Sequence, residues 1–400
     1  MLDMLNILNI QDNNVPDVLT LDEAFKSCIE SNSTSLIYGA YAFVTTGGFD
    51  IMFNNIGQKQ HIKQVNLIIG MDGITNTECV EYLKKTDPKI FDIKAYIPNT
   101  SSAIFHPKFC ILANDNKSKG WLIIGSGNLT VRGIRKNQEA YTAIELSENN
   151  LNEVLKTWEN WLNATNKNIK NLNDEIVTAR ALRNSHTFRR PSTKGVRTSG
   201  SKKSRDDSST QTPPGDTFSS ERKDLDGWLF NKESEVLIAE IPKASTRWNQ
   251  ANFDKKTYLE YFAGSLVTSK KQVILRHVSP VNGVLESIEY RPCVAVKSQN
   301  YRVELSAASG LDYPKSEAPI AVFINVGKRT FIYSLFMPEH AYYHVLRKWV
   351  DYNWKKSGGR SDRKCRLTFP FHEHRKLLQP TELYKYFEDE QSNLMNIESS

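Results

Sequence analysis

Short apolar segments alternate with amphipathic segments through the first 165 residues of the chain. Segments rich in β-branched and aromatic residues predict strands at residues 35–45, 65–70, 91–97, 108–113, 120–125 and 141–146. A helical repeat of apolar positions predicts helices at residues 20–31, 76–86 and 149–164. Because strands and helices alternate along the sequence, this part is expected to fold as an α/β sandwich.

The pattern changes after residue 182. Residues 183–223 are rich in Ser, Thr, Lys, Arg, Pro and Gly, which predicts a flexible basic linker because such a segment buries too little apolar surface to fold. Strand-like runs then return at residues 236–241, 272–278, 292–296, 301–305, 320–326 and 330–336, with one helix expected near 338–352. The predicted organisation is a first domain at 1–182, the linker, a mainly β domain at 224–380 and a polar tail at 381–400.

Positive charge is concentrated in two segments. The chain carries a net charge of +7, and residues 183–223 contribute +6 of it while residues 347–376 contribute +7. The remainder is therefore slightly acidic. Two basic segments on an acidic body favour a polyanionic partner, because neutralising phosphates supplies most sequence-independent affinity for nucleic acids. A solvated run of charge explains either segment alone equally well.

The apolar and cysteine patterns suggest a protein of the cytoplasm. No apolar run approaches the length of about 18–20 residues that spans a bilayer, and the first residues lack the basic region of a secretory signal. We therefore expect no contact with a membrane. The five cysteines form no CxxC pair, which argues against a disulfide framework and a zinc knuckle.

Three neighbouring sequence features suggest phosphoryl chemistry. They are His106-Pro107-Lys108, Gly125-Ser126-Gly127-Asn128 and Glu139. Residues i and i+2 of a strand share a face, so the imidazole and the ammonium can address one phosphate, the first as nucleophile and the second as fixed positive charge. The glycines allow the turn to bring Asn128 close, and Glu139 could orient the imidazole. Two other His-x-Lys/Arg sequences, beginning at His61 and His374, are followed by neither feature.

Together, these residues resemble the HKD motif of the phospholipase D superfamily, in particular its small bacterial nucleases. The resemblance implies an α/β phospholipase D-like fold and a phosphohistidine intermediate. It also implies no metal ion and no cofactor. The implied catalytic residues are His106, Lys108, Ser126, Asn128 and Glu139. The sequence departs from the family at Ala113, where an Asp is expected, and in a longer segment between Lys108 and Asn128.

Only one such motif occurs in the chain. Family members use two histidines, one as the nucleophile and one to protonate the leaving oxygen. The resemblance therefore implies a homodimer whose shared site contains His106 and Lys108 from both copies.

A nuclease domain followed by a mainly β domain resembles the BfiI and NgoFVII type restriction endonucleases, whose C-terminal part is a B3-like pseudobarrel. The resemblance implies sequence-specific cleavage of double-stranded DNA and a cognate methyltransferase as partner. Candidate DNA-binding residues are Lys243, Arg247, Trp248, Asn249, Gln250, Asn252, Lys297, Asn300, Arg302, Lys355, Lys356 and Arg360. Arg, Asn and Gln pair with base edges, whereas lysines near glycines suit backbone phosphates. Trp248 could stack on a base, although tryptophan is more often buried.

Other functions remain open. The same chemistry serves lipid and other phosphodiester hydrolases. The HKD domain could be inactive in a DNA-binding protein, or the chain could be one subunit of an ATP-dependent restriction complex. No Walker A sequence occurs here, so such a complex would need a separate helicase or ATPase chain. A metal-dependent nuclease motif is limited to Glu221-Arg222-Lys223 in the linker, and His372-Glu373-His374 lacks the spacing of a zinc site.

Overall fold

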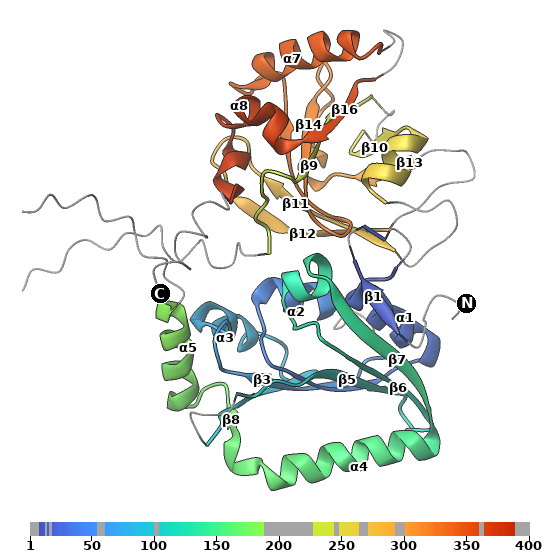
Figure 1. Cartoon of the computed structure of the whole chain (residues 1–400), viewed down its shortest axis with the longest axis vertical. Helices are drawn as coiled ribbons and strands as arrows, with labels where there is room; N and C mark the ends of the chain where they lie inside the picture. Colours follow the sequence, from blue (N-terminus) through green and yellow to red (C-terminus); the bar gives the residue numbers. More distant parts are fainter. Residues whose placement is uncertain are drawn as a thin grey trace, which may run out of the picture.

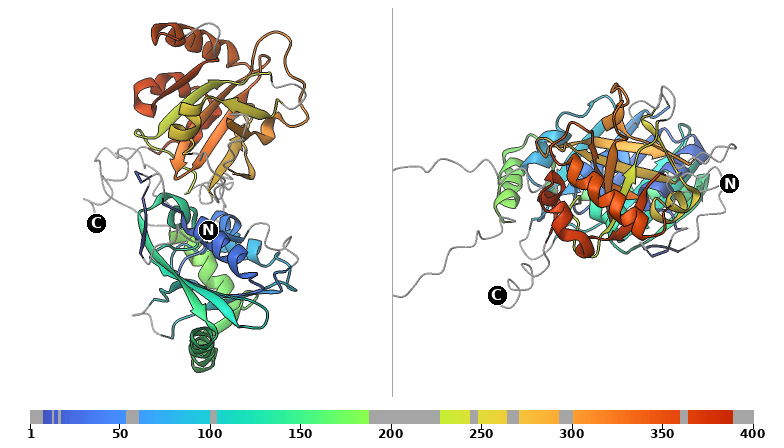
Figure 2. Two further views of the ribbon diagram at one scale, coloured as in Figure 1. Left: turned by 90° about the vertical axis from the view of Figure 1, so that its right-hand side faces the viewer. Right: turned by 90° about the horizontal axis from the view of Figure 1, so that it is seen from above.

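The computed structural model describes residues 8–12, 14–15, 18–53, 61–99, 104–187, 227–243, 248–263, 271–292, 301–359 and 364–388. Residues up to 187, the N-terminal part, form an α/β arrangement, and residues from 227, the C-terminal part, are mainly β. The two parts stack along the long axis of the molecule (Figures 1 and 2). Most of the predicted linker, residues 188–223, lies outside the described residues.

In the described residues of the N-terminal part, eight strands form one mixed sheet in the order β1-β7-β6-β5-β2-β3-β4-β8. They are β1 (Asn9–Gln11), β2 (Leu36–Tyr41), β3 (Gln64–Gly70), β4 (Phe91–Tyr96), β5 (Lys108–Ala113), β6 (Lys119–Gly125), β7 (Glu139–Ser147) and β8 (Ile169–Asn171). Strands β2, β3 and β4 run parallel, while β5, β6 and β7 are successive antiparallel neighbours. All six predicted strands are confirmed.

Helices cover both faces of this sheet (Figure 1). They are α1 (Leu21–Asn32), α2 (Thr46–Phe53), α3 (Thr77–Leu83), α4 (Glu148–Ala164) and α5 (Glu175–Thr187). Helix α4 lies alone on one face, where Leu151, Leu155 and Trp158 pack on apolar residues of the strands. The three predicted helices are confirmed as α1, α3 and α4. Within the described residues, no helix combines the length and apolarity needed to cross a membrane.

Helix α2 is not predicted from the sequence, because its first turn contains two glycines. A Cβ atom on Gly48 would lie 2.2 Å from the carbonyl oxygen of Leu129. Glycine is therefore required there for α2 to pack against the segment that follows β6. Its presence serves a close contact between two backbones, even though glycine weakens a helix in isolation.

The C-terminal part contains two separate sheets among its described residues. Six strands have the order β12-β11-β15-β14-β9-β16, and β10 pairs with β13 alone. The strands are β9 (Glu235–Glu240), β10 (Gln250–Phe253), β11 (Gln272–Val278), β12 (Leu285–Pro292), β13 (Tyr301–Glu304), β14 (Ile320–Gly327), β15 (Thr330–Phe336) and β16 (Arg366–Pro370). In the described residues this is a mostly β region without a closed barrel, so a B3-like pseudobarrel stays a prediction.

Several boundaries differ from those expected. Helix α7 (Tyr343–Lys356) begins later than residue 338, and most of the run predicted at 292–296 lies outside the described residues. Regular structure continues past residue 380, where α8 (Arg375–Leu378) is followed by a 3₁₀ turn (Glu382–Tyr386). Leu383 and Tyr386 are buried, so residues 381–388 pack as part of the molecule, while 389–400 lie outside the described residues.

Candidate active site

Strand order brings the chemically interesting residues to one edge of the N-terminal sheet. Because β5, β6 and β7 are antiparallel neighbours, the start of β5, the end of β6 and the start of β7 lie side by side. Strand β2 also ends there, since Tyr41 pairs with Lys108. Lys108 and Glu139 alternate with residues that point toward α4, so both side chains belong to the face that carries α1 and α2.

His106 and Lys108 contact each other directly. His106 is exposed, and Lys108 Nζ lies 3.0 Å from its Nδ1 and 3.1 Å from its Nε2. The ring of His106 also packs edge-to-face on Phe43, with centroids 5.9 Å apart. The unprotonated nitrogen of a neutral imidazole can accept such a bond, and it is also the atom that a nucleophilic histidine uses.

Lys108 is electrostatically linked to Glu139. Partial burial lowers the pKa of Lys108 from its usual value because the ammonium loses hydration, and the carboxylate of Glu139 acts in the opposite direction. Glu139 therefore favours the charged form of the lysine. This is the form that would stabilise negative charge on a phosphate.

Glu139 is held by two hydrogen bonds. Ser126 Oγ donates to Oε2, and Asn137 Nδ2 donates to Oε1 over 3.0 Å. Ser126 is itself fixed to β7, since its amide donates to the Ala140 carbonyl over 2.9 Å. Among the residues that the structure describes, His106 does not hydrogen-bond to Glu139. The expected orientation of the imidazole by Glu139 is therefore not observed, and the carboxylate acts on Lys108 instead.

Asn128 offers a polar group that the described residues leave unpaired. Its side-chain oxygen Oδ1 is buried and has no hydrogen-bond partner in the described part of the chain. Buried polar atoms are normally satisfied, so this unpaired acceptor is suited to a hydrogen-bond donor of a ligand or of a second protein surface. Asn137 and Phe43 also contribute to the site, although their spacing in the sequence gives no signal for either.

The departure at Ala113 lies away from this edge. Ala113 ends β5 and is buried in the cluster beneath α4. Five residues at about 3.3 Å each separate it from Lys108 by roughly 17 Å along the strand. The missing Asp therefore removes no group from the edge where His106 and Lys108 lie.

Comparison with known families matches residues 27–165 to the model described as "Cardiolipin synthase, PLD-like domain". These residues form a phospholipase D-like domain. All five candidate catalytic residues lie within it. No curated protein matches the sequence.

Several solved structures align with part of this chain. Nuc from Salmonella typhimurium, a phospholipase D family member, has 16% identity and a TM-score of 0.31 over 41% of this chain and 94% of its own. NucT from Helicobacter pylori has 13% identity and a TM-score of 0.28 over 41% of this chain and 98% of its own. Yeast tyrosyl-DNA phosphodiesterase has 15% identity and a TM-score of 0.24 over 35% of this chain and 32% of its own.

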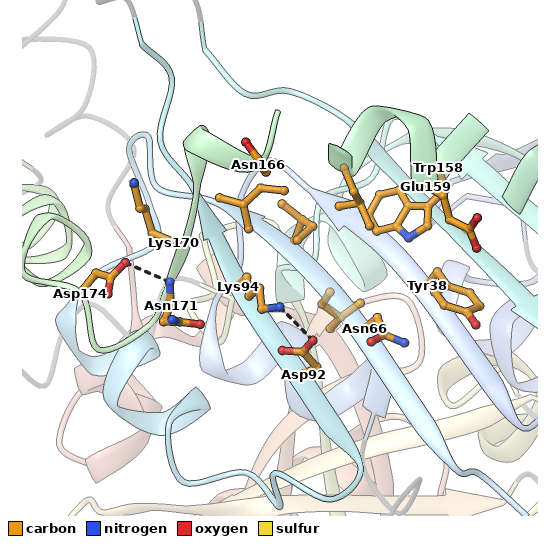
Figure 3. A pocket seen from close by; sticks show the side chains of 14 residues that line it. Tyr38, Asn66, Asp92, Lys94, Trp158, Glu159, Asn166, Lys170, Asn171 and Asp174 are labelled. Atoms are coloured by element: carbon orange, nitrogen blue, oxygen red, sulfur yellow. Dashed lines mark hydrogen bonds and ion pairs between the residues drawn. The ribbon is translucent and has the colours of Figure 1, made fainter. Parts of the chain in front are cut away.

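A pocket of about 500 Å³ lies on the other face of the phospholipase D-like domain, along α4. Figure 3 shows Tyr38, Asn66 and Lys94 on its floor, with Trp158 and Glu159 from α4 at one side. None of the five candidate catalytic residues lines it. The pocket is therefore separate from the candidate active site.

Three of the candidate DNA-binding residues come together in the C-terminal part. Gln250 and Asn252 lie on β10, and Arg302 lies opposite them on β13. The Arg302 guanidinium donates to Gln250 Oε1 over 3.1 Å and to Asn252 Oδ1 over 3.2 Å. Their alternation with buried residues places all three on the outer face of this β10–β13 ribbon.

The other candidates are scattered. Trp248 is only 4% exposed, and its indole donates to the Leu311 carbonyl over 2.7 Å, so it is a core residue and the expectation of base stacking is not retained. Asn249 is half-buried, and Lys243, Lys355 and Lys356 are exposed. Arg247, Lys297, Asn300 and Arg360 lie outside the described residues.

The histidines considered for zinc have structural roles. His372 hydrogen-bonds to the Lys232 carbonyl at 3.0 Å, and His374 packs against Trp349 and Phe369. In the described part of the chain, no group of three or more His, Cys, Asp or Glu residues is arranged to hold a metal ion.

Proposed function

We propose that this chain is a metal-independent endonuclease that cleaves double-stranded DNA at specific sequences. The observation that carries the proposal is the meeting of His106, Lys108, Ser126, Asn128 and Glu139 at one sheet edge of a phospholipase D-like domain. A nucleophile and a fixed cation at one place are two of the groups that cleavage of a phosphodiester uses.

The reaction proceeds in two displacements at phosphorus. A nitrogen of His106 attacks with its lone pair, the bond to the leaving oxygen breaks, and that oxygen takes a proton from a general acid. Water then gives a proton to the same group and attacks phosphorus, which breaks the phosphorus–nitrogen bond and restores His106. Lys108 stabilises the charge on the non-bridging oxygens in both steps, and Glu139 keeps it protonated.

The general acid is His106 of a second copy, in a homodimer. Two features support this. The sequence carries a single motif. Apolar side chains are also exposed on neighbouring strands on the α4 side of the sheet, opposite Lys108 and Glu139, and one of them, Ile124, directly precedes Gly125 and Ser126 at the strand end. These side chains are Ile10, Ile124 and Ile144, which are 54%, 45% and 44% exposed. Exposed apolar residues grouped on adjacent strands are typical of an interaction surface.

Sequence recognition is assigned to the C-terminal part, as in a B3-like restriction enzyme. The β10–β13 ribbon supports this role, because amide and guanidinium groups on one face can pair with base edges in the major groove. The exposed Lys355 and Lys356 at the end of α7 are suited to backbone phosphates.

Plasmid cleavage in excess EDTA tests the proposal. We expect discrete fragments from the wild type and none from His106→Ala, which should still bind DNA. His61→Ala is the matched control, because His61 is exposed and begins another His-x-Lys sequence. Equal cleavage by His106→Ala would refute the assigned nucleophile. No cleavage by the wild type would favour a helicase-dependent or purely DNA-binding protein.

A further inference from the structure

A short π-helical turn, η1 (Arg132–Lys136), connects the two ends of the candidate site. It lies between Asn128 and Glu139 in the sequence. A Cβ atom on Gly133 would lie 2.5 Å from the Asn128 carbonyl oxygen, so the turn packs tightly on the backbone of that residue. π-Helical turns are rare and occur frequently at functional sites.

The same turn is also tied to the segment that leads into Glu139. Gln11 Nε2 donates to the Gly133 carbonyl over 3.3 Å and to the Asn137 carbonyl over 3.0 Å. Asn137 in turn holds the Glu139 carboxylate. A shift of η1 would therefore move Asn128 and Glu139 together.

Backbone groups of the C-terminal part form hydrogen bonds with the backbone and side chains of η1. The Lys328 amide donates to the Arg135 carbonyl over 2.6 Å. Arg135 Nη1 donates to the carbonyls of Gln272 and Lys328 over 3.1 Å and 3.3 Å. Lys136 Nζ donates to the Leu229 carbonyl over 2.8 Å. These contacts lie at the junction between the two stacked parts (Figure 1).

A buried ionic network fixes this junction. Arg135 pairs with Asp22 at 2.7 Å and with Glu23 at 3.4 Å, and Arg329 pairs with the same Glu23 through Nε at 2.9 Å. All four side chains are fully buried. Arg329 belongs to the turn between β14 and β15 and adopts a positive φ of 49°, which is unfavourable for a residue with a side chain.

The charge of Glu23 is balanced by one arginine from each part, Arg135 and Arg329, so the network is complete only when the two parts are in contact. Burial alone would raise the pKa of Glu23, but Arg329 and Arg135 outweigh it and hold the value at about 2. Removing one arginine would leave buried charge uncompensated, which is strongly destabilising at that place. The position of Arg135, and with it that of η1, therefore depends on the C-terminal part being docked.

We infer that Arg135 and Arg329 are positioning residues for cleavage: the C-terminal part, besides any contact with DNA, holds η1 so that Asn128 and Glu139 take their places in the site. This inference rests on the proposed phosphodiesterase function. It gives the C-terminal part a role in turnover that does not involve DNA recognition.

The test uses the full chain and bis(p-nitrophenyl) phosphate, a small diester that needs no sequence recognition. Arg329→Gln should lower kcat at least tenfold with KM within about twofold, because Arg329 acts through η1 and does not contact His106. Hydrogen exchange should become faster in residues 126–139 but not in α4. Lys136→Met removes a more peripheral contact and should give a smaller fall in kcat, which keeps the test available if Arg329→Gln does not fold.

Arg347→Gln is the matched control. Arg347 is an ion-paired arginine of the C-terminal part that bonds to Glu240 and Asp351, both also in the C-terminal part. Unchanged kcat in Arg329→Gln and Lys136→Met would overturn the inference, and so would exchange that rises equally in α4. If the wild type does not hydrolyse the diester, the proposed function fails, and the exchange pattern alone then decides whether the C-terminal part positions residues 126–139.

Discussion

Two opposing effects set the pKa of Lys108: its partial burial and the nearby carboxylate of Glu139. Partial burial lowers its pKa, and Glu139 partly offsets that effect. Glu139 can do so because Ser126 and Asn137 hold its two oxygens in place. In this site Glu139 therefore supports the Lys108 cation, while His106 is oriented by its contacts with Lys108 and Phe43.

The pH profile of cleavage tests this role of Glu139. Lys108 is charged below its pKa and loses its charge as the pH rises through it, so activity should fall on the alkaline side at a pH below the usual lysine value of 10.5. Glu139→Gln should shift this alkaline limb to lower pH, because the opposing carboxylate is gone. Glu145→Gln, an exposed residue of the same strand, should leave the limb in place. An unshifted limb in Glu139→Gln would argue against the coupling.

At the scale of elements, the β10–β13 ribbon is where we propose that bases are read. Pairing of Asn252 with Arg302 fixes the register, and the guanidinium bridges two amide oxygens along β10. Because Arg302 engages the amide oxygens, the amide nitrogens of Gln250 and Asn252 are the donors that could bond to a base. A preorganised row of this kind loses little side-chain entropy on binding.

Arg302→Ala should weaken binding to the target sequence by about 1–3 kcal/mol, the usual range for one bidentate base contact, because Gln250 and Asn252 lose the guanidinium that holds their amides in place. Turnover of bis(p-nitrophenyl) phosphate should not change. The measurement is a binding titration against target and unrelated duplexes at fixed salt. Lys256→Ala removes a comparable exposed charge from the same part of the chain and serves as the control. Equal losses on both duplexes would assign Arg302 to phosphate contact and not to base reading.

At the scale of the whole molecule, the two parts share a continuous apolar core at their junction, in which Ile134 and Trp228 belong to one cluster. The sheet face that exposes Ile124 and Ile144 lies on the side of α4, away from that cluster. Docking of the C-terminal part therefore leaves this face free for a second copy.

The combined substitution Ile124→Lys and Ile144→Lys should give a monomer in sedimentation equilibrium and reduce cleavage at least a hundredfold. Charge on two adjacent strands would be buried without partners in the dimer. Val345→Lys, at an exposed apolar position of α7, is the control and should change neither property. A dimer that survives the double substitution would place the interface elsewhere, whereas a fully active monomer would refute the composite site.

The sequence alone determined six of the eight strands and three of the five helices described in the N-terminal part. Strand and helix periodicity is a local property, so the six strands and three helices follow from it. The spacing of His106 and Lys108 likewise places both at one strand start, and the family motif adds Asn128 and Glu139. Helix α2 is missed because Gly48 near its start is required by a close contact with the distant backbone of Leu129.

Only the tertiary structure decided which partners these residues meet. Glu139 contacts Ser126 and supports Lys108, Trp248 is buried against Leu311, and Arg135 meets Glu23 and the turn that carries Arg329. Such contacts join segments separated by up to 306 residues. Local periodicity contains no information about them, because they depend on how sheets and turns pack in space.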